Sequence, residues 1–151
     1  MTQFRILVAT DLTDESLALL RQAEDVSFEI VPPNPATLRP RLREAHALIS
    51  RDDLTVDDAL LEHAPHLRII ARVTAGIAHV DVDSATQRGI LVMNTPGANA
   101  IAAGEHTLTL MLALSRRLPL AHNSLREGYW LLDRKRQAGV QLFGKTLGII
   151  G

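Results

Sequence analysis

The sequence has 151 residues, of which 46% are hydrophobic and 22% are charged, a composition typical of a folded globular protein. A formal net charge of −1 argues against nucleic acid or an anionic membrane as a partner, and the absence of cysteine excludes disulfides and thiol chemistry. The longest apolar run, residues 108–114, is shorter than the roughly 20 residues that span a bilayer. No signal peptide is recognisable, so we expect a cytoplasmic protein.

Short apolar runs alternate with helical patterns from the start of the chain to about residue 95. The runs predict strands over residues 4–10, 26–31, 47–50, 67–73 and 90–94. The intervening patterns predict four helices. The first is capped by Thr13 or Asp14, with Leu17, Leu19, Leu20 and Ala23 facing inward. The second covers residues 38–45 and is limited by Pro40, and the fourth covers residues 81–88 and is ended by Gly89. The third runs from Thr55 or Asp57 to Pro65, with Ala59, Leu60 and Leu61 facing inward.

This alternation predicts an α/β fold, with a parallel sheet and helices on both faces. After Pro96 the pattern changes to a long helix, Ala100–Arg117, whose second half is apolar almost all round. Such a helix is expected to be buried against a second domain or a second subunit. A helix over 120–128, a basic patch at Arg134–Arg136 and a sixth strand over 146–150 are predicted to follow.

In parallel sheets ligands bind at the carboxyl ends of the strands. Arg72 ends one predicted strand and precedes a loop of small residues, Thr74–Ile77, whose N–H groups could approach an anion. Arg51 follows the neighbouring strand, so the two guanidinium groups would supply positive charge at one edge. The alternative is a tight turn with surface arginines. The side chain of Asn99 either caps the long helix or offers its amide to a ligand.

Metal binding and dinucleotide binding have weaker support. The six histidines lack metal-ligand spacing, so no metal site is expected. The segment Gly148–Gly151 resembles the strand and first glycine that open a dinucleotide-binding fold, but the rest of the GxGxxG pattern is absent.

Three segments together resemble the D-isomer-specific 2-hydroxyacid dehydrogenase family. Residues 72–81 (RVTAGIAHVD) resemble the family loop RVGTGVDNVD, and residues 89–105 (GILVMNTPGANAIAAGE) resemble its stretch around NTP. Residues 144–151 (GKTLGIIG) resemble the approach to its cofactor fingerprint. The similarity extends from about Leu48 to Gly151, and it favours the members that act on 3-phosphoglycerate.

The resemblance implies a flavodoxin-like substrate domain over residues 1–95 that lacks its C-terminal return helix. It implies that residues 96–151 begin a Rossmann domain, with its opening helices and first strand only. It implies hydride transfer between NAD and a D-2-hydroxy or 2-oxo acid, and a homodimer formed through the Ala100–Arg117 helix. By position, the implied substrate ligands are Arg51, Arg72, Asn99 and the backbone of Gly76 and Ile77, and the implied cofactor contacts are Ala75 and Gly151.

The sequence also departs from the family pattern. Thr74 replaces a frequent glycine, Ala75 a frequent threonine, and Ala78-His79 the usual Asp-Asn pair, which leaves the particular 2-hydroxy acid open. The family's catalytic His, Arg and carboxylate lie beyond Gly151, so no catalytic residue is assigned and the isolated chain is expected to be inactive.

Two other functions stay open from the sequence. Asp11 and Asp14 follow the first strand, as in a receiver-like or flavodoxin-like binding module, although Ser50-Arg51 ends the third strand where a receiver carries a phosphorylatable aspartate. The long apolar helix is also compatible with a dimerisation module.

Overall fold

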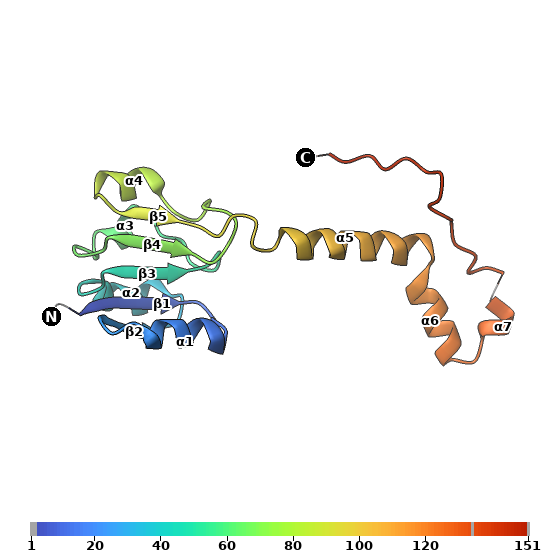
Figure 1. The fold of residues 1–151 in the computed structure, drawn as a ribbon, viewed down its shortest axis with the longest axis horizontal. Coiled ribbons are helices and arrows are strands. Elements are labelled where there is room, and N and C mark those ends of the chain that lie inside the picture. The colour runs from blue at the N-terminus through green and yellow to red at the C-terminus, as the bar shows by residue number, and fades with distance from the viewer. Residues whose placement is uncertain (1–2, 134, 151) are drawn as a thin grey trace. The chain divides into compact units, whose positions relative to one another are not determined.

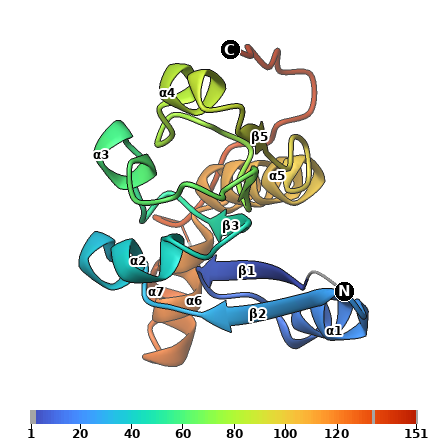
Figure 2. The same ribbon diagram turned by 90° about the vertical axis from the view of Figure 1, so that its left-hand side faces the viewer.

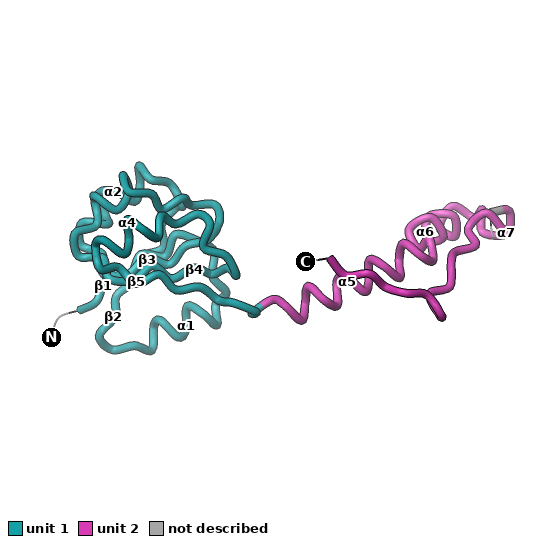
Figure 3. Tube along the Cα trace, turned by 90° about the horizontal axis from the view of Figure 1, so that it is seen from above, with its two compact units in different colours: residues 1–98 teal, residues 99–151 magenta. Residues whose placement is uncertain are grey.

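The structure is a computed structural model that describes residues 3–133 and 135–150 (Figure 1). The chain forms two compact units, residues 1–98 and 99–151, coloured separately in Figure 3. We describe each unit by itself.

The first unit is built on five parallel strands in the order β2-β1-β3-β4-β5. Their nearly continuous apolar runs suit strands that are covered on both faces. The strands are β1 (Phe4–Ala9), β2 (Val26–Ile30), β3 (Ala47–Ser50), β4 (Ile69–Arg72) and β5 (Leu91–Met93). This order is the flavodoxin-like one, which confirms the predicted fold class of this part of the chain. All the strands are parallel, but the order in which successive strands are added reverses between β1 and β3, so the loops after these two strands diverge at the carboxyl edge.

Four helices connect these strands, and Figure 2 shows α1 on one side of the sheet with α2 and α3 on the other. Each has an N-cap side chain that accepts a backbone N–H, which satisfies one of the free donors of the first turn. The helices are α1 (Asp14–Gln22), α2 (Pro35–Leu42), α3 (Asp58–Leu61) and α4 (Val82–Gln87), with caps Thr13, Asn34, Asp57 and Asp81.

Several helix predictions were wrong in detail. Leu19 is 69% exposed, because it lies about 200° around α1 from the buried Leu17. Ala23 follows the end of α1 in an extended conformation and is exposed, and Ala59 is also exposed. The second helix starts at Pro35 rather than 38 and contains Pro40 in its interior. A short helix tolerates the one lost backbone hydrogen bond because Leu38 and Leu42 are fully buried beneath it.

The two faces of the sheet differ in how well they are covered. On one face Leu48 and Ile70 are fully buried, and Val92 packs against the same core. The opposite face of β4 and β5 carries Ile69, which is paired in register with Leu91, and Met93. These three side chains are 36%, 56% and 50% exposed, so part of this face is open in the first unit.

The second unit contains α5 (Ala100–Ser115), α6 (Leu118–Arg126) and α7 (Trp130–Asp133). The two longer helices were predicted to within two residues at each end. Residues 146–150 are not a strand, so that prediction was wrong: no described segment of this unit pairs with them, and a strand needs a paired neighbour. Of the predicted basic patch, Lys135 and Arg136 are exposed, while Arg134 lies outside the described residues.

None of the helices in residues 3–133 and 135–150 combines the length and the apolar character that crossing a bilayer requires.

Candidate functional site

The loop after β4 joins three strand ends at the carboxyl edge of the sheet. The Val73 amide donates to the Ser50 carbonyl at the end of β3, at 2.9 Å. The Thr74 carbonyl accepts the amide of Thr95 at 3.0 Å and its hydroxyl at 3.2 Å, just after β5. The backbone of the loop is therefore held on both sides by neighbouring strands.

The turn Thr74–Ile77 is closed by two side-chain hydrogen bonds, one from within the turn and one from Asn94. The Gly76 amide donates to the Thr74 hydroxyl at 3.0 Å, and the Asn94 side-chain amide donates to the Ala75 carbonyl at 2.8 Å. Within the described chain the amide of Ile77 has no acceptor, and this residue is 43% exposed. Of the two backbone donors predicted for an anion, the Gly76 amide is thus occupied and that of Ile77 is open.

Arg72 differs from both predictions made for it, since its side chain is fully buried. Its Nη1 donates to the Ser50 hydroxyl at 3.0 Å, to the Leu54 carbonyl at 3.4 Å and to the Arg51 carbonyl. Its Nη2 forms an ion pair with Asp52 at 2.8 Å, while its buried Nε has no partner in the described chain. A buried guanidinium needs such acceptors, and here they fasten the loop after β3 to the end of β4.

Arg51 presents its side chain to solvent beside this buried clamp. The residue is exposed, and no carboxylate among residues 3–133 and 135–150 lies within ion-pair distance of its guanidinium. Its carbonyl is the part that Arg72 holds. The site therefore has one accessible cation at this edge, where the sequence suggested two.

The remaining predicted residues lie in the second unit. Asn99 precedes α5 with φ −108° and ψ 5°, makes no side-chain capping bond and is exposed. Its capping role is therefore not observed, because a capping residue normally has an extended backbone. Gly151 lies outside the described residues.

Sequence reasoning did not single out Ser50 and Asp52, the side-chain partners of Arg72. It also missed the roles of Thr74 and Asn94 in closing the turn. A polar residue at or just after each strand end was the available signal.

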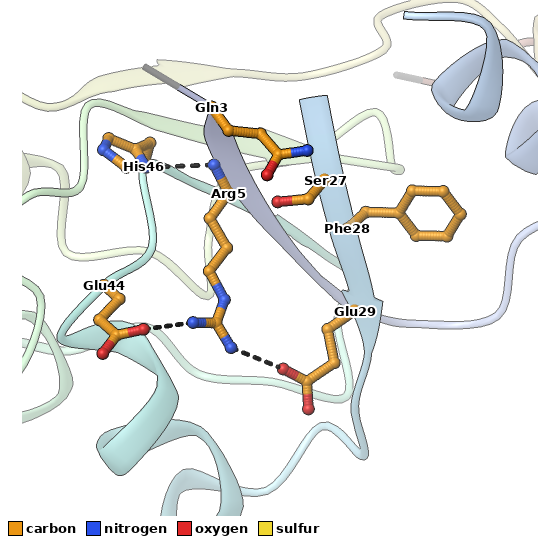
Figure 4. Close-up of a pocket in the computed structure, with 7 residues that line it drawn as sticks. All are labelled: Gln3, Arg5, Ser27, Phe28, Glu29, Glu44 and His46. Carbon is orange, nitrogen blue, oxygen red and sulfur yellow. Dashed lines mark hydrogen bonds and ion pairs between the residues drawn. The ribbon is translucent and has the colours of Figure 1, made fainter. Parts of the chain in front are cut away.

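Two of the cavities that flank the sheet away from the turn border β1 and β2. One, of about 350 Å³, lies at the carboxyl edge between β1, β2 and β3, with Asp11 and Asp53 in its wall. The other, of about 480 Å³, lies at the amino edge and is drawn in Figure 4. There Arg5 bridges Glu29 and Glu44, and Arg41 also pairs with Glu29, so each acid of this cavity has an arginine partner.

In the described chain no three His, Asp or Glu side chains come together as they would around a metal ion. Glu29 is the clearest electrostatic feature: its hydrogen bond from Arg41 lowers the pKa of the carboxyl, burial opposes this, and Arg5 adds to it. This group lies on β2, which β1 and β3 separate from β4 and the turn that follows it.

The sequence profile of the D-isomer specific 2-hydroxyacid dehydrogenase catalytic domain matches residues 6–146. The chain belongs to this family.

The curated relatives of the chain include D-3-phosphoglycerate dehydrogenases. That of Mycobacterium tuberculosis is 42% identical over 146 residues, and that of Archaeoglobus fulgidus is 36% identical over 150 residues. Each alignment covers 97% of this chain but only 27% and 28% of the relative. The chain thus spans about a quarter of the length of these relatives.

Solved structures show the same fold. A protein of Thermus thermophilus is 32% identical, with a TM-score of 0.75 over 84% of this chain and 42% of its own. The NADPH-dependent glyoxylate/hydroxypyruvate reductase of Sinorhizobium meliloti, solved with citrate, is 27% identical, with a TM-score of 0.76 over 97% of this chain and 45% of its own.

Proposed function

We propose that this chain is the substrate-binding, N-terminal part of an NAD-dependent dehydrogenase that acts on a D-2-hydroxy acid, with 3-phosphoglycerate as the favoured substrate. The observation that carries the proposal is the 42% identity with a D-3-phosphoglycerate dehydrogenase over nearly the whole chain. Residues 1–95 would form most of the substrate domain and residues 96–151 would begin the cofactor domain.

The turn after β4 is the proposed carboxylate site. The open Ile77 amide would donate to one substrate oxygen, and the Gly76 amide would join it once the Thr74 hydroxyl turns away. Arg51 would supply the positive charge for a carboxylate or phosphate. Arg72 would act indirectly, as a positioning residue that holds the Arg51 loop. The role of Asn99 as a substrate contact stays a prediction.

The described residues do not fit NAD by themselves. A dinucleotide cradle needs a strand, a glycine turn and a helix N-terminus, whereas residues 145–150 contain neither strand nor helix. The chemistry that NAD would supply in the whole enzyme is hydride transfer. In this chain only Ala75, an exposed residue of the turn, and Gly151 are proposed to contact it. We therefore propose that the isolated chain binds substrate but does not oxidise it.

A titration of the isotope-labelled chain with 3-phosphoglycerate tests this proposal by NMR. The amide signals of residues 75–77 should shift to saturation. Arg51→Gln should weaken binding about tenfold, because one charge-assisted contact is lost. Arg21→Gln, which removes an exposed charge on α1, is the matched control. Unshifted 75–77 signals, or equal weakening in both variants, would refute the site.

The activity proposal has its own assay. The chain is incubated with NAD and 3-phosphoglycerate, and NADH absorbance is followed. No NADH should form above the rate without protein. Steady NADH production would show that the chain is itself the enzyme.

We also propose a homodimer formed through α5. Ile101 and Leu114 of this helix are each 81% exposed and Leu108 is 52% exposed. Among the described residues of the second unit only Ser124 is buried, so its apolar side chains lack a core within the unit. A second copy of the chain would cover them.

A further inference from the structure

A basic pocket lies at the amino edge of the sheet, at the opposite ends of the strands from the turn after β4. Its cavity is about 400 Å³, and its charged or titratable lining side chains are His46, His66, Arg68 and Arg88. These residues come from the loops before β3, before β4 and before β5. No acidic side chain lines it, although the chain as a whole carries a net charge of −1.

The backbone of Arg68 is fixed by hydrogen bonds, whereas its side chain forms no ion pair in the described chain. Its amide donates to the His46 carbonyl at 2.9 Å, and its carbonyl accepts the Leu91 amide at 2.8 Å. Within residues 3–133 and 135–150 its exposed guanidinium has no carboxylate within ion-pair distance. The pocket therefore contains a cation whose attachment point is fixed and whose charge is unpaired.

Arg88 is anchored through one nitrogen only. Its Nη1 contacts Asp58 at 2.7 Å and the Ser84 carbonyl at 3.2 Å. Its Nη2 and Nε have no acceptor in the described chain, and the side chain is 30% exposed. A guanidinium fixed at one corner loses little conformational entropy when the rest of its fork binds a ligand oxygen.

The imidazole of His46 adds a third oriented donor. Its Nδ1 accepts the Arg5 amide at 3.1 Å, so the neutral ring carries its proton on Nε2. The ring stacks on that of His66, with centroids 6.4 Å apart and planes at 27°. The donor set of the pocket thus consists of two guanidinium groups and an imidazole whose tautomer is set by the backbone.

His46 also lines the cavity of Figure 4, so the charges of that cavity can be compared with those of the basic pocket. On that side of the ring Arg5 is paired with Glu29 and Glu44, and Glu29 also pairs with Arg41, so two arginines face two acids. Among the described residues, Asp58 is the one carboxylate that pairs with an arginine of the basic pocket; it lies outside the lining, contacts Arg88 and leaves Arg68 uncompensated. One unit of positive charge therefore remains for a ligand to neutralise.

We propose that the basic pocket binds a small oxyanion of the phosphate class. A phosphate group offers four oxygens around one centre, so it can accept from both arginines and from His46 together, and its charge matches the uncompensated cation. This site is separate from the proposed substrate turn and does not depend on it.

Inorganic phosphate is the probe that tests the pocket, added to the labelled chain at constant ionic strength set with chloride. The amide signals of His66, Arg68 and Gly89 should shift along one saturable curve. Arg68→Gln should weaken phosphate binding about tenfold, since the uncompensated charge is lost. Arg21→Gln removes the same charge from the exposed end of α1 and should leave the curve unchanged.

Three results would overturn the proposal. They are shifts that grow linearly without saturation, shifts spread over all the basic residues, and equal weakening in both variants; each means an adventitious ion only. Arg68→Lys keeps the positive charge and should retain part of the affinity, and unchanged signals of residues 75–77 show that Arg68→Gln is folded. The signals of residues 75–77 report on the substrate turn, so failure of one site is visible separately from failure of the other.

Discussion

At the scale of single residues, Arg72 shows how burial changes the role of a charged group. A guanidinium at a strand end is expected to face solvent or a ligand, but here every contact of the group is with the protein. Its acceptors belong to the loop that carries Arg51. Positive charge at the carboxyl edge is therefore supplied by Arg51, and the shape of the edge is maintained by Arg72.

Replacing Arg72 should destabilise the first unit. Arg72→Met leaves the Ser50 hydroxyl and two loop carbonyls without their donor, at a cost of about 3 kcal/mol in the free energy of unfolding. Asp52→Asn removes the countercharge alone and should cost less, while Asp53→Asn is the matched control. Urea unfolding followed by circular dichroism measures all three. If Arg72→Met unfolds at the wild-type midpoint, the clamp has no energetic role.

Thr74 controls the accessibility of the Gly76 amide. Thr74→Val keeps the shape of the side chain but removes the hydroxyl, so hydrogen exchange at this amide should accelerate about fivefold. Thr86→Val, which removes a hydroxyl within α4, should leave it unchanged. An unaltered rate in Thr74→Val would mean that the hydroxyl does not protect this donor.

Glu29 contributes to the loss of folding stability at low pH. Its pKa is lowered in the folded state, so its stabilisation is fully present above its unfolded value of 4.5 and is lost as the pH falls through the folded pKa. Glu29→Gln should therefore reduce the loss of stability between pH 6 and pH 3, by less than about 1 kcal/mol because the carboxylate is partly exposed. Thermal melts against pH, with Glu24→Gln as control, measure it. Identical pH profiles for wild type and Glu29→Gln would contradict the assignment.

At the scale of elements, a helix starts where a nearby side chain can accept a hydrogen bond from a backbone N–H of the first turn. Thr13, Asn34, Asp57 and Asp81 each accept a backbone N–H, and three of these starts could be read from the sequence. The start of α2 could not, because Pro40 was expected near the first turn of the helix, which placed the start at residue 38. Burial of Leu38 and Leu42 outweighs the hydrogen bond that Pro40 removes.

The caps of α1 and α5 should differ in their effect on stability. Thr13→Ala removes a capping bond to Ser16 and should cost about 1 kcal/mol, measured by urea unfolding. Asn99→Ala removes no such bond and should cost almost nothing. An equal loss in both variants would show that Asn99 caps α5 in solution.

At the scale of the whole molecule, the main feature is the apolar surface that the described chain leaves exposed. The open face of β4 and β5 and the helix α5 both expose large aliphatic side chains. Soluble monomers rarely leave such surface uncovered. Both features suit a chain that spans only about a quarter of its relatives' length.

Self-association through α5 should therefore be measurable by sedimentation velocity. The wild-type chain should sediment as a dimer, and Leu114→Glu should shift it toward monomer because a charge would be buried in the interface. Leu19→Glu places the same charge on a leucine of α1 that is 69% exposed and should leave the dimer intact. A monomeric wild-type chain, or equal dissociation in both variants, would contradict the interface.

The alternation of strands and helices, the parallel sheet, the turn after β4 and the family can all be predicted from the sequence. These features depend on periodicity and on short motifs, which are local in the chain. Three features could be seen only in the folded chain: Arg72 is buried, Thr74 occupies the Gly76 amide, and residues 146–150 are not a strand. Each of these depends on which distant groups come within hydrogen-bonding distance, and a pattern along the chain does not carry that information.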